Sequence, residues 1–125
     1  ADLRHVCEQS VRLLLRAKGA DHLIAITDCA RTPLPPYEVR DGLIFRDGII
    51  CGSQSTMHAL LKNLVQTLGV SLPQAVRMTS TNIALALGEP LGDIREGYRA
   101  DFLVLDGALN LLAVRAGGAL EAISK

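Results

Sequence analysis

The chain has 125 residues, and its 13 Lys and Arg are balanced by 13 Asp and Glu, so the formal net charge is zero. Zero net charge, four aromatic residues and no tryptophan argue against a nucleic-acid binder, which needs a basic surface and stacking platforms. No apolar run approaches the roughly 18 residues of a membrane-spanning helix. Leucine and alanine are abundant, at 21 and 15 residues, so the chain can form a core. The share of apolar residues is higher than in a typical soluble domain. We therefore expect part of the apolar surface to be covered, either by a partner chain or by a missing part of the protein.

The first residues and the cysteines indicate the compartment. Residues 1–5 lack the basic and then apolar layout of a secretory signal. The three cysteines, Cys7, Cys29 and Cys51, are odd in number and form no Cys-x-x-Cys pair, so we expect reduced thiols in a cytoplasmic protein.

The first elements predicted along the chain are a helix and a buried strand. Apolar spacing predicts a helix over Glu8–Lys18, and Gly19 is a natural stop. The apolar run Leu23–Thr27 is typical of a strand covered on both faces, and it ends at Asp28. The proline-containing residues 29–36 can be neither helix nor central strand.

Turn residues and helix caps organise the remaining chain. Two Asp-Gly pairs within Tyr37–Cys51 predict β-hairpins. Ser71 and Gln74 have the spacing of a capping box. The other expected elements are helices over about 56–68, from 71 to about 79 and from Thr81 or Asn82 to Gly88, followed by strands over Phe102–Asp106 and Leu109–Arg115.

A helix that leads into a buried strand with an acidic end is typical of an α/β barrel or a doubly wound sheet. A closed barrel needs eight strands and about 250 residues, and only one strand here has the pattern of burial on both faces. We therefore expect at most the last quarter or so of a barrel.

Asp28 is the first candidate for catalysis. Side chains at the carboxyl ends of barrel strands face the active site, where a carboxylate can act as a general acid or base. The alternative is that Asp28 only caps a turn before the prolines. Its position in the sequence, taken alone, favours this alternative somewhat.

Other candidates are weaker. His5, His22 and His58 have no metal-ligand spacing, and only His5, which precedes a helix, lies where active-site loops occur. Residues 52–56 precede a helix, so they could hold an anion or a sugar hydroxyl, or Ser53 or Ser55 could simply cap that helix.

Several segments in a fixed order carry a family resemblance. The segments are Asp2-Leu3-Arg4-His5-Val6, Thr27-Asp28-Cys29-Ala30, Cys51-Gly52-Ser53-Gln54-Ser55-Thr56-Met57, residues 69–80, and Gly97-Tyr98-Arg99-Ala100-Asp101-Phe102-Leu103-Val104-Leu105-Asp106. In this order they resemble the C-terminal third of the N-acetylglucosamine-6-phosphate deacetylases, within the amidohydrolase superfamily. The last segment is general to amidohydrolases, whereas the segments around Asp28 and Thr56 are more specific.

The resemblance implies a fold and a reaction. The fold is the last part of an amidohydrolase-type (β/α)8 barrel over residues 1–101, with residues 102–125 returning to a small β-sandwich, so the fold is incomplete in this chain. The reaction is hydrolysis of the N-acetyl group of N-acetylglucosamine 6-phosphate. The family uses a divalent metal, zinc or similar, whose ligands lie in strands that this chain lacks, so the chain alone is expected to be inactive.

The resemblance also assigns roles to individual residues. Asp28 matches the aspartate that takes a proton from the metal-bound water and passes it to the departing amine. His5 matches a substrate-contacting histidine, and Ile50, Cys51 and Gly52 match a loop that touches the sugar phosphate. Leu3 departs from the family because it stands where a glycine is usual, at a turn that needs a positive φ.

Three hypotheses therefore remain. The first is the C-terminal part of a deacetylase-like enzyme, the second a non-catalytic module that covers its apolar surface by self-association or with a partner, and the third one half of a split hydrolase. We favour the first, with an amino-sugar phosphate as substrate and either a homo-oligomer or a missing N-terminal part.

Overall fold

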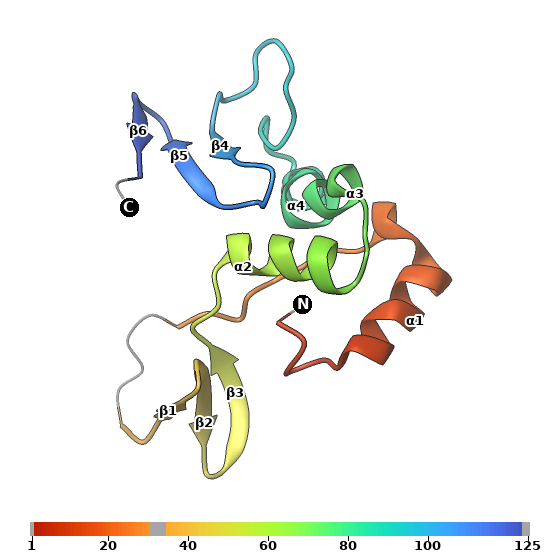
Figure 1. Ribbon diagram of the computed structural model, residues 1–125, viewed down its shortest axis with the longest axis vertical. Helices are drawn as coiled ribbons and strands as arrows, with labels where there is room; N and C mark the ends of the chain where they lie inside the picture. Colours follow the sequence, from red (N-terminus) through yellow and green to blue (C-terminus); the bar gives the residue numbers. More distant parts are fainter. Residues whose placement is uncertain (1, 31–34, 124–125) are drawn as a thin grey trace. The chain divides into compact units, whose positions relative to one another are not determined.

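The computed structural model describes residues 2–30 and 35–123, and it divides into two compact units, Ala1–Thr79 and Ser80–Lys125 (Figure 1). Of the proline-containing stretch 29–36, residues 31–34 lie outside the described residues, and the others belong to no helix and no named strand. The expected boundary between residues 101 and 102 stays a prediction.

The first predicted helix is confirmed as α1, Glu8–Lys18. Gly19 ends it with a φ of 74°, which is favourable for glycine because no Cβ is present to clash. Arg12 on α1 donates hydrogen bonds to the carbonyl oxygens of Thr67 and Leu68, at 3.1 and 2.8 Å. This guanidinium ties α1 to a segment more than 50 residues away.

The second predicted helix is present as α2, Met57–Lys62, continued by the π-helical turn η2, Asn63–Thr67. Leu60 and Leu64 on its inner face are completely buried, as the apolar spacing predicts. Gly69, with a φ of 70°, follows the helical residues. The repeat of apolar residues thus locates the core of the first unit.

The third and fourth predicted helices are helical, but the predicted break between them is wrong, because residues 72–87 form one continuous helical stretch. They are α3, Leu72–Val76, the π-helical turn η3, Arg77–Thr81, and α4, Asn82–Leu87. The predicted capping box is wrong in detail, because the Ser71 hydroxyl donates to the Gln74 side-chain oxygen at 2.8 Å and accepts no backbone N–H.

The structure also rules out the alternative, left open by the sequence, that Ser53 or Ser55 caps the second helix. The residue that caps α2 is Thr56, whose hydroxyl accepts the N–H of Ala59 at 3.1 Å, and neither Ser53 nor Ser55 has this role. Thr81, one of the two residues at which the sequence predicts the fourth helix to begin, has helical backbone angles itself and makes no side-chain cap, so α4 continues directly from η3. Cap position depends on where the backbone leaves the extended region, and several hydroxyl residues in a row make that position ambiguous.

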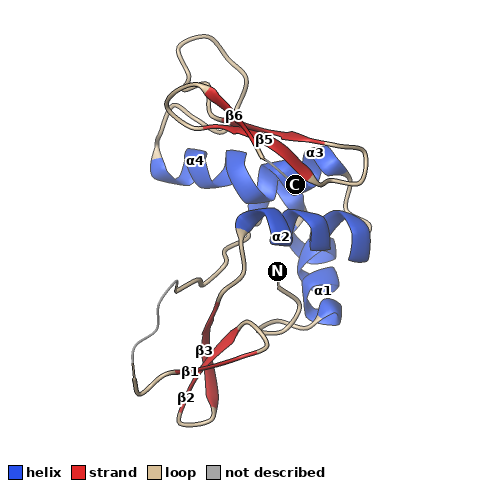
Figure 2. Ribbon diagram, turned by 60° about the vertical axis from the view of Figure 1, so that its left-hand side comes forward, coloured by secondary structure: helices blue, strands red, loops and turns tan. Residues whose placement is uncertain are grey.

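The predicted hairpins are confirmed as a three-stranded antiparallel sheet of β1, Glu38–Arg40, β2, Leu43–Arg46, and β3, Ile49–Ser53 (Figure 2). Both Asp-Gly pairs have positive φ at the two turn residues, between 51° and 77°. Such turns match the right-handed twist of the flanking strands. Figures 1 and 2 show this sheet at one end of the first unit, apart from α1 and α2.

The strand predicted over Leu23–Thr27 is not found. After the short 3₁₀ turn η1, Ala20–His22, these residues belong to no strand, although Leu23 is extended. The physical reason is that a strand requires a hydrogen-bonded neighbour. Ala25 is buried and its N–H bonds the carbonyl oxygen of Met78 at 2.9 Å, whereas Ile26 is 66% exposed.

The second unit contains an antiparallel sheet of β4, Phe102–Leu105, β5, Leu111–Arg115, and β6, Leu120–Ala122. The first two strands are predicted from the sequence and the third is not. Asp101 accepts the N–H of Gly117 at 2.7 Å, which connects the start of β4 to the turn before β6. Among the described residues, no helix is both long and apolar enough to span a membrane.

Leu3 stands where the resemblance implies a glycine, and its backbone still has a left-handed conformation, with a φ of 63°. A non-glycine residue there costs about 1–2 kcal/mol, and glycine would return about 0.5–1 kcal/mol of that in unfolded-state entropy. Leu3→Gly and Leu3→Ala both remove the half-buried leucine side chain, so their difference isolates the backbone, and we expect Leu3→Gly to be the more stable of the two by about 0.5 kcal/mol in urea unfolding. The same pair of substitutions at the exposed Leu13, inside α1, is the control, where glycine should be less stable than alanine by about 1 kcal/mol. If glycine were also the less stable residue at position 3, a strained Leu3 would be contradicted.

Candidate active site

Asp28 directly follows the segment Leu23–Thr27 and lies beside the end of β3. Its carbonyl oxygen accepts the N–H of Ser53 at 2.8 Å, and the N–H of Ala30 bonds the carbonyl oxygen of Ser53 at 3.0 Å. These two bonds form a parallel bridge between Cys29 and Ser53. Asp28 itself has a φ of 51°, which aspartate tolerates better than most residues. The bridge fixes the backbone of Asp28 at the edge of the sheet.

Ser53 is completely buried and holds the same segment with its side chain. Its hydroxyl donates to the carbonyl oxygen of Thr27 at 2.7 Å and accepts the N–H of Ser55 at 3.1 Å. This use of Ser53 was missed from the sequence, where residues 52–56 suggest an anion site or a cap. No local pattern distinguishes an inward serine from a capping serine, because the partner lies 26 residues away.

Gly52 allows the close approach of β3 to Asp28. A Cβ on Gly52 would lie 3.2 Å from the carbonyl oxygen of Asp28 and 3.5 Å from Cδ1 of Ile44, and the first distance is tighter than an ordinary contact. The neighbouring Cys51 thiol donates to the carbonyl oxygen of Ile44 at 3.5 Å. Glycine at this position therefore lets the two segments approach without displacing the Asp28 carbonyl.

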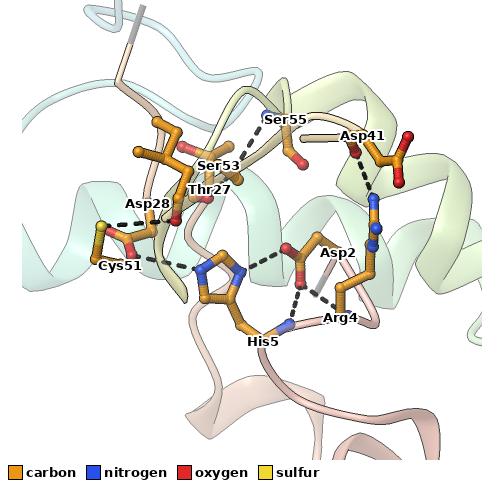
Figure 3. Close-up of polar contacts among 10 residues, drawn as sticks. Asp2, Arg4, His5, Thr27, Asp28, Asp41, Cys51, Ser53 and Ser55 are labelled. Carbon is orange, nitrogen blue, oxygen red and sulfur yellow. Dashed lines mark hydrogen bonds and ion pairs between the residues drawn. The ribbon is translucent and has the colours of Figure 1, made fainter. Parts of the chain in front are cut away.

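His5 is held by Asp2 in the turn before α1 (Figure 3). Asp2 Oδ2 lies 2.6 Å from His5 Nδ1, and Asp2 Oδ1 accepts the N–H groups of Arg4 and His5, both at 3.1 Å. Burial raises the pKa of Asp2, but the hydrogen bonds from the His5 ring and the two N–H groups together outweigh it and lower this pKa below its ordinary value. The Arg4 guanidinium bonds the carbonyl oxygen of Asp41 and joins this turn to the β1–β2 turn.

The other ring nitrogen of His5 faces Asp28. Figure 3 shows the imidazole between the two aspartates, with Nε2 3.8 Å from Asp28 Oδ2. This separation is too long for a hydrogen bond. The Asp28 side chain is 60% exposed, whereas that of Asp2 is 9% exposed. Two predicted site residues, from segments more than 20 positions apart, thus meet in the structure.

Two cavities meet at Asp28. One of about 420 Å³ is lined by Asp2, His5 and Asp28 and otherwise mostly by apolar side chains, among them Leu14, Ile24 and Met78. A second of about 300 Å³ is lined by Asp28, Cys29, Ala30, Tyr37, Ile44, Cys51 and Gly52. Ile50, the remaining predicted site residue, lines neither of these two cavities.

A metal centre is not formed by the part of the chain that the structure describes. No three His, Cys, Asp or Glu side chains among those residues come together as a ligand set. Asp2, His5 and Asp28 are adjacent, but Asp2 already binds His5 and two backbone N–H groups. The described residues do not fit a metal by themselves.

Comparison with known families identifies the chain. The Amidohydrolase family model matches residues 12–124. The chain belongs to the amidohydrolase family. Members of this family are generally metal-dependent.

Individual relatives are more specific. The chain is 33% identical over 129 residues to the N-acetylglucosamine-6-phosphate deacetylase of Lysinibacillus sphaericus and 35% identical over 132 residues to the N-acetylgalactosamine-6-phosphate deacetylase of Shewanella sp. (strain ANA-3). The alignments cover 93% and 95% of this chain and 33% of each relative. The chain therefore spans about one third of the length of these curated relatives.

A solved structure supports the same relationship. The N-acetylglucosamine-6-phosphate deacetylase from Pasteurella multocida superposes with a TM-score of 0.87 at 29% identity, over 98% of this chain and 35% of that one. The match confirms the predicted fold class, part of an amidohydrolase (β/α)8 barrel with a small β-sandwich.

The contact between Gly52 and Asp28 can be tested by Gly52→Ala. The added methyl group must move the Asp28 carbonyl by a few tenths of an ångström, so we expect a loss of about 1–2 kcal/mol in the free energy of unfolding and altered NMR shifts for the amides of Ala30 and Ser53. Gly107→Ala, where nothing lies within 4 Å, is the control. Unchanged shifts at Ala30 and Ser53 would contradict the close approach.

The lowered pKa of Asp2 predicts a dependence of stability on pH. Because this pKa is lower in the folded than in the unfolded protein, the ionised carboxylate stabilises the fold above about pH 5. The stabilisation disappears as the pH falls through the folded-state pKa. Asp2→Asn should therefore be less stable than the native sequence by about 1 kcal/mol at pH 7, and the difference should shrink below pH 4 in urea unfolding. A pH-independent difference would contradict the ionic role.

Proposed function

We propose that this chain forms the part of a metal-dependent deacetylase that carries the acid–base carboxylate. The reaction is hydrolysis of the acetamide of an N-acetylated amino-sugar 6-phosphate to the free amine and acetate. The observation that carries this proposal is the meeting of His5 and Asp28, 3.8 Å apart at the polar end of a mostly apolar cavity. The names of the two curated relatives support the substrate class.

Asp28 has the properties that the proton transfers require. Attack of water on the acetyl carbonyl releases a proton, and cleavage of the C–N bond requires a proton on the departing nitrogen. A single carboxylate that accepts the first and donates the second completes the cycle unchanged. The side chain of Asp28 is largely exposed, whereas its backbone is fixed by hydrogen bonds to Ser53. The carboxylate can therefore exchange protons with a bound molecule without moving.

The sugar and phosphate would contact residues on both sides of Asp28. We propose that His5 binds a sugar hydroxyl in the larger cavity and that Ile50, Cys51 and Gly52 contact the phosphate. Cys51 and Gly52 line the second cavity beside Asp28, which supports this placement. Ile50 would contribute through its backbone, since it lines neither cavity.

The relatives act on two epimeric amino sugars, according to their names. We propose N-acetylglucosamine 6-phosphate as the substrate, and assays with both epimers decide between them. The divalent metal of the family, zinc or similar, would take its ligands from outside the described residues. We further propose a cytoplasmic location, in which the exposed free thiols of Cys7, Cys29 and Cys51 stay reduced. The homo-oligomer stays a prediction.

Asp28→Asn tests the proposed role in the intact, metal-loaded protein. Asparagine tolerates a positive φ, so the backbone at residue 28 is retained while the carboxylate is lost. We expect kcat for deacetylation to fall by about 10²–10⁴-fold, with little change in the thermal unfolding midpoint.

The matched control is Asp47→Asn in the β2–β3 turn. Asp47 also has a positive φ, at 53°, and its side chain is 85% exposed. This variant should keep full activity. If Asp28→Asn retains the activity of the Asp47→Asn control, the proton-transfer role is wrong.

A further inference from the structure

Asp2 engages both of its carboxylate oxygens. Oδ1 accepts the N–H groups of Arg4 and His5 at 3.1 Å, which closes the turn. Oδ2 lies 2.6 Å from Nδ1 of the His5 ring. Figure 3 shows this carboxylate on the opposite side of the imidazole from Asp28. The first oxygen thus bonds the backbone of the turn, and the second bonds the imidazole ring.

The second oxygen determines which ring nitrogen carries the proton. An ionised carboxylate can only accept hydrogen bonds, and the lowered pKa of Asp2 keeps it ionised. His5 Nδ1 must therefore carry a hydrogen. In the neutral imidazole, Nε2 then has a free lone pair, and this lone pair faces the cavity at Asp28.

We propose that Asp2 is a positioning residue that holds His5 in the Nδ1–H tautomer, so that Nε2 accepts a hydrogen bond from a hydroxyl of the bound sugar. This inference rests on the proposed function for the identity of the ligand. The 3.8 Å between Nε2 and Asp28 Oδ2 leaves both atoms able to accept from a hydroxyl or a water near them. The tautomer itself depends only on the contacts of Asp2.

Asp2→Asn in the intact protein separates the role of Oδ1 in the turn from the role of Oδ2 at the imidazole. The two backbone N–H groups require an acceptor, so the amide oxygen takes the place of Oδ1 and the NH₂ group is directed at His5 Nδ1. Nδ1 must then accept, and the proton of the neutral ring moves to Nε2. Nε2 becomes a donor and can no longer accept from the sugar.

The tautomer is measured directly by NMR of ¹⁵N-labelled histidine at a pH where the ring is neutral. We expect Nδ1–H in the native sequence and Nε2–H in Asp2→Asn. We also expect the KM for the sugar phosphate to rise about 10- to 100-fold, with a smaller change in kcat, because the lost bond is made to the bound substrate.

Asp106→Asn is the matched control. Asp106 also closes a turn, with Oδ1 accepting the N–H groups of Ala108 and Asn110 and Oδ2 bonding the Asn110 side chain. This variant should leave the His5 tautomer and KM unchanged. A structural effect alone would lower stability in both variants and leave the tautomer as it is.

Specific results overturn the inference. Nε2–H in the native protein does so without any variant, and so does an unchanged tautomer in a folded Asp2→Asn protein. A changed tautomer with an unchanged KM overturns the role in substrate binding. If the native protein deacetylates neither sugar phosphate but shows the Nδ1–H tautomer, then the proposed function fails and only the control of the tautomer by Asp2 stands.

Discussion

The site depends on the attachment of residues 27–30 to the end of β3. Ser53 makes three of these bonds, through its hydroxyl, its N–H and its carbonyl oxygen. The serine side chain is completely buried, so water cannot replace these partners and each bond is costly to lose. Gly52 lets the two backbones come together. A hairpin from the middle of the chain thereby determines where Asp28 stands.

Both turns that carry the candidate residues contain a left-handed, non-glycine residue. Asp28 has a φ of 51°, and Leu3, between Asp2 and His5, has a φ of 63°. Such conformations persist only where surrounding bonds determine them, which here are the Ser53 bridge and the bonds of Asp2 to the turn. The local strain is offset by contacts that direct two side chains toward one cavity. These two conformations lower the stability of the fold slightly and place the side chains of His5 and Asp28 precisely.

Features that depend on local chemistry could be predicted from the sequence, and those that depend on distant partners could not. The Asp-Gly turns need only their own two residues to adopt positive φ, and the apolar repeat around Leu60 and Leu64 needs only helical geometry. The segment Leu23–Thr27 has a strand sequence, but its state depends on neighbours that the described residues do not supply. The resemblance to a known family was enough to single out Asp28 and His5 as candidate site residues. It gave no role to Asp2 or Ser53, whose roles are visible only in contacts.

The two aspartates beside His5 are chemically alike but stand in different environments. Asp2 is nearly buried, and its hydrogen bonds lower its pKa and fix its orientation. Asp28 is largely exposed on the cavity side and is held by its backbone. A carboxylate that is fully hydrogen-bonded is suited to orienting a neighbour, because protonating it would break those bonds. A carboxylate that is open to a cavity is suited to exchanging protons with a bound molecule. The difference in surroundings therefore matches the two roles proposed for these otherwise identical side chains.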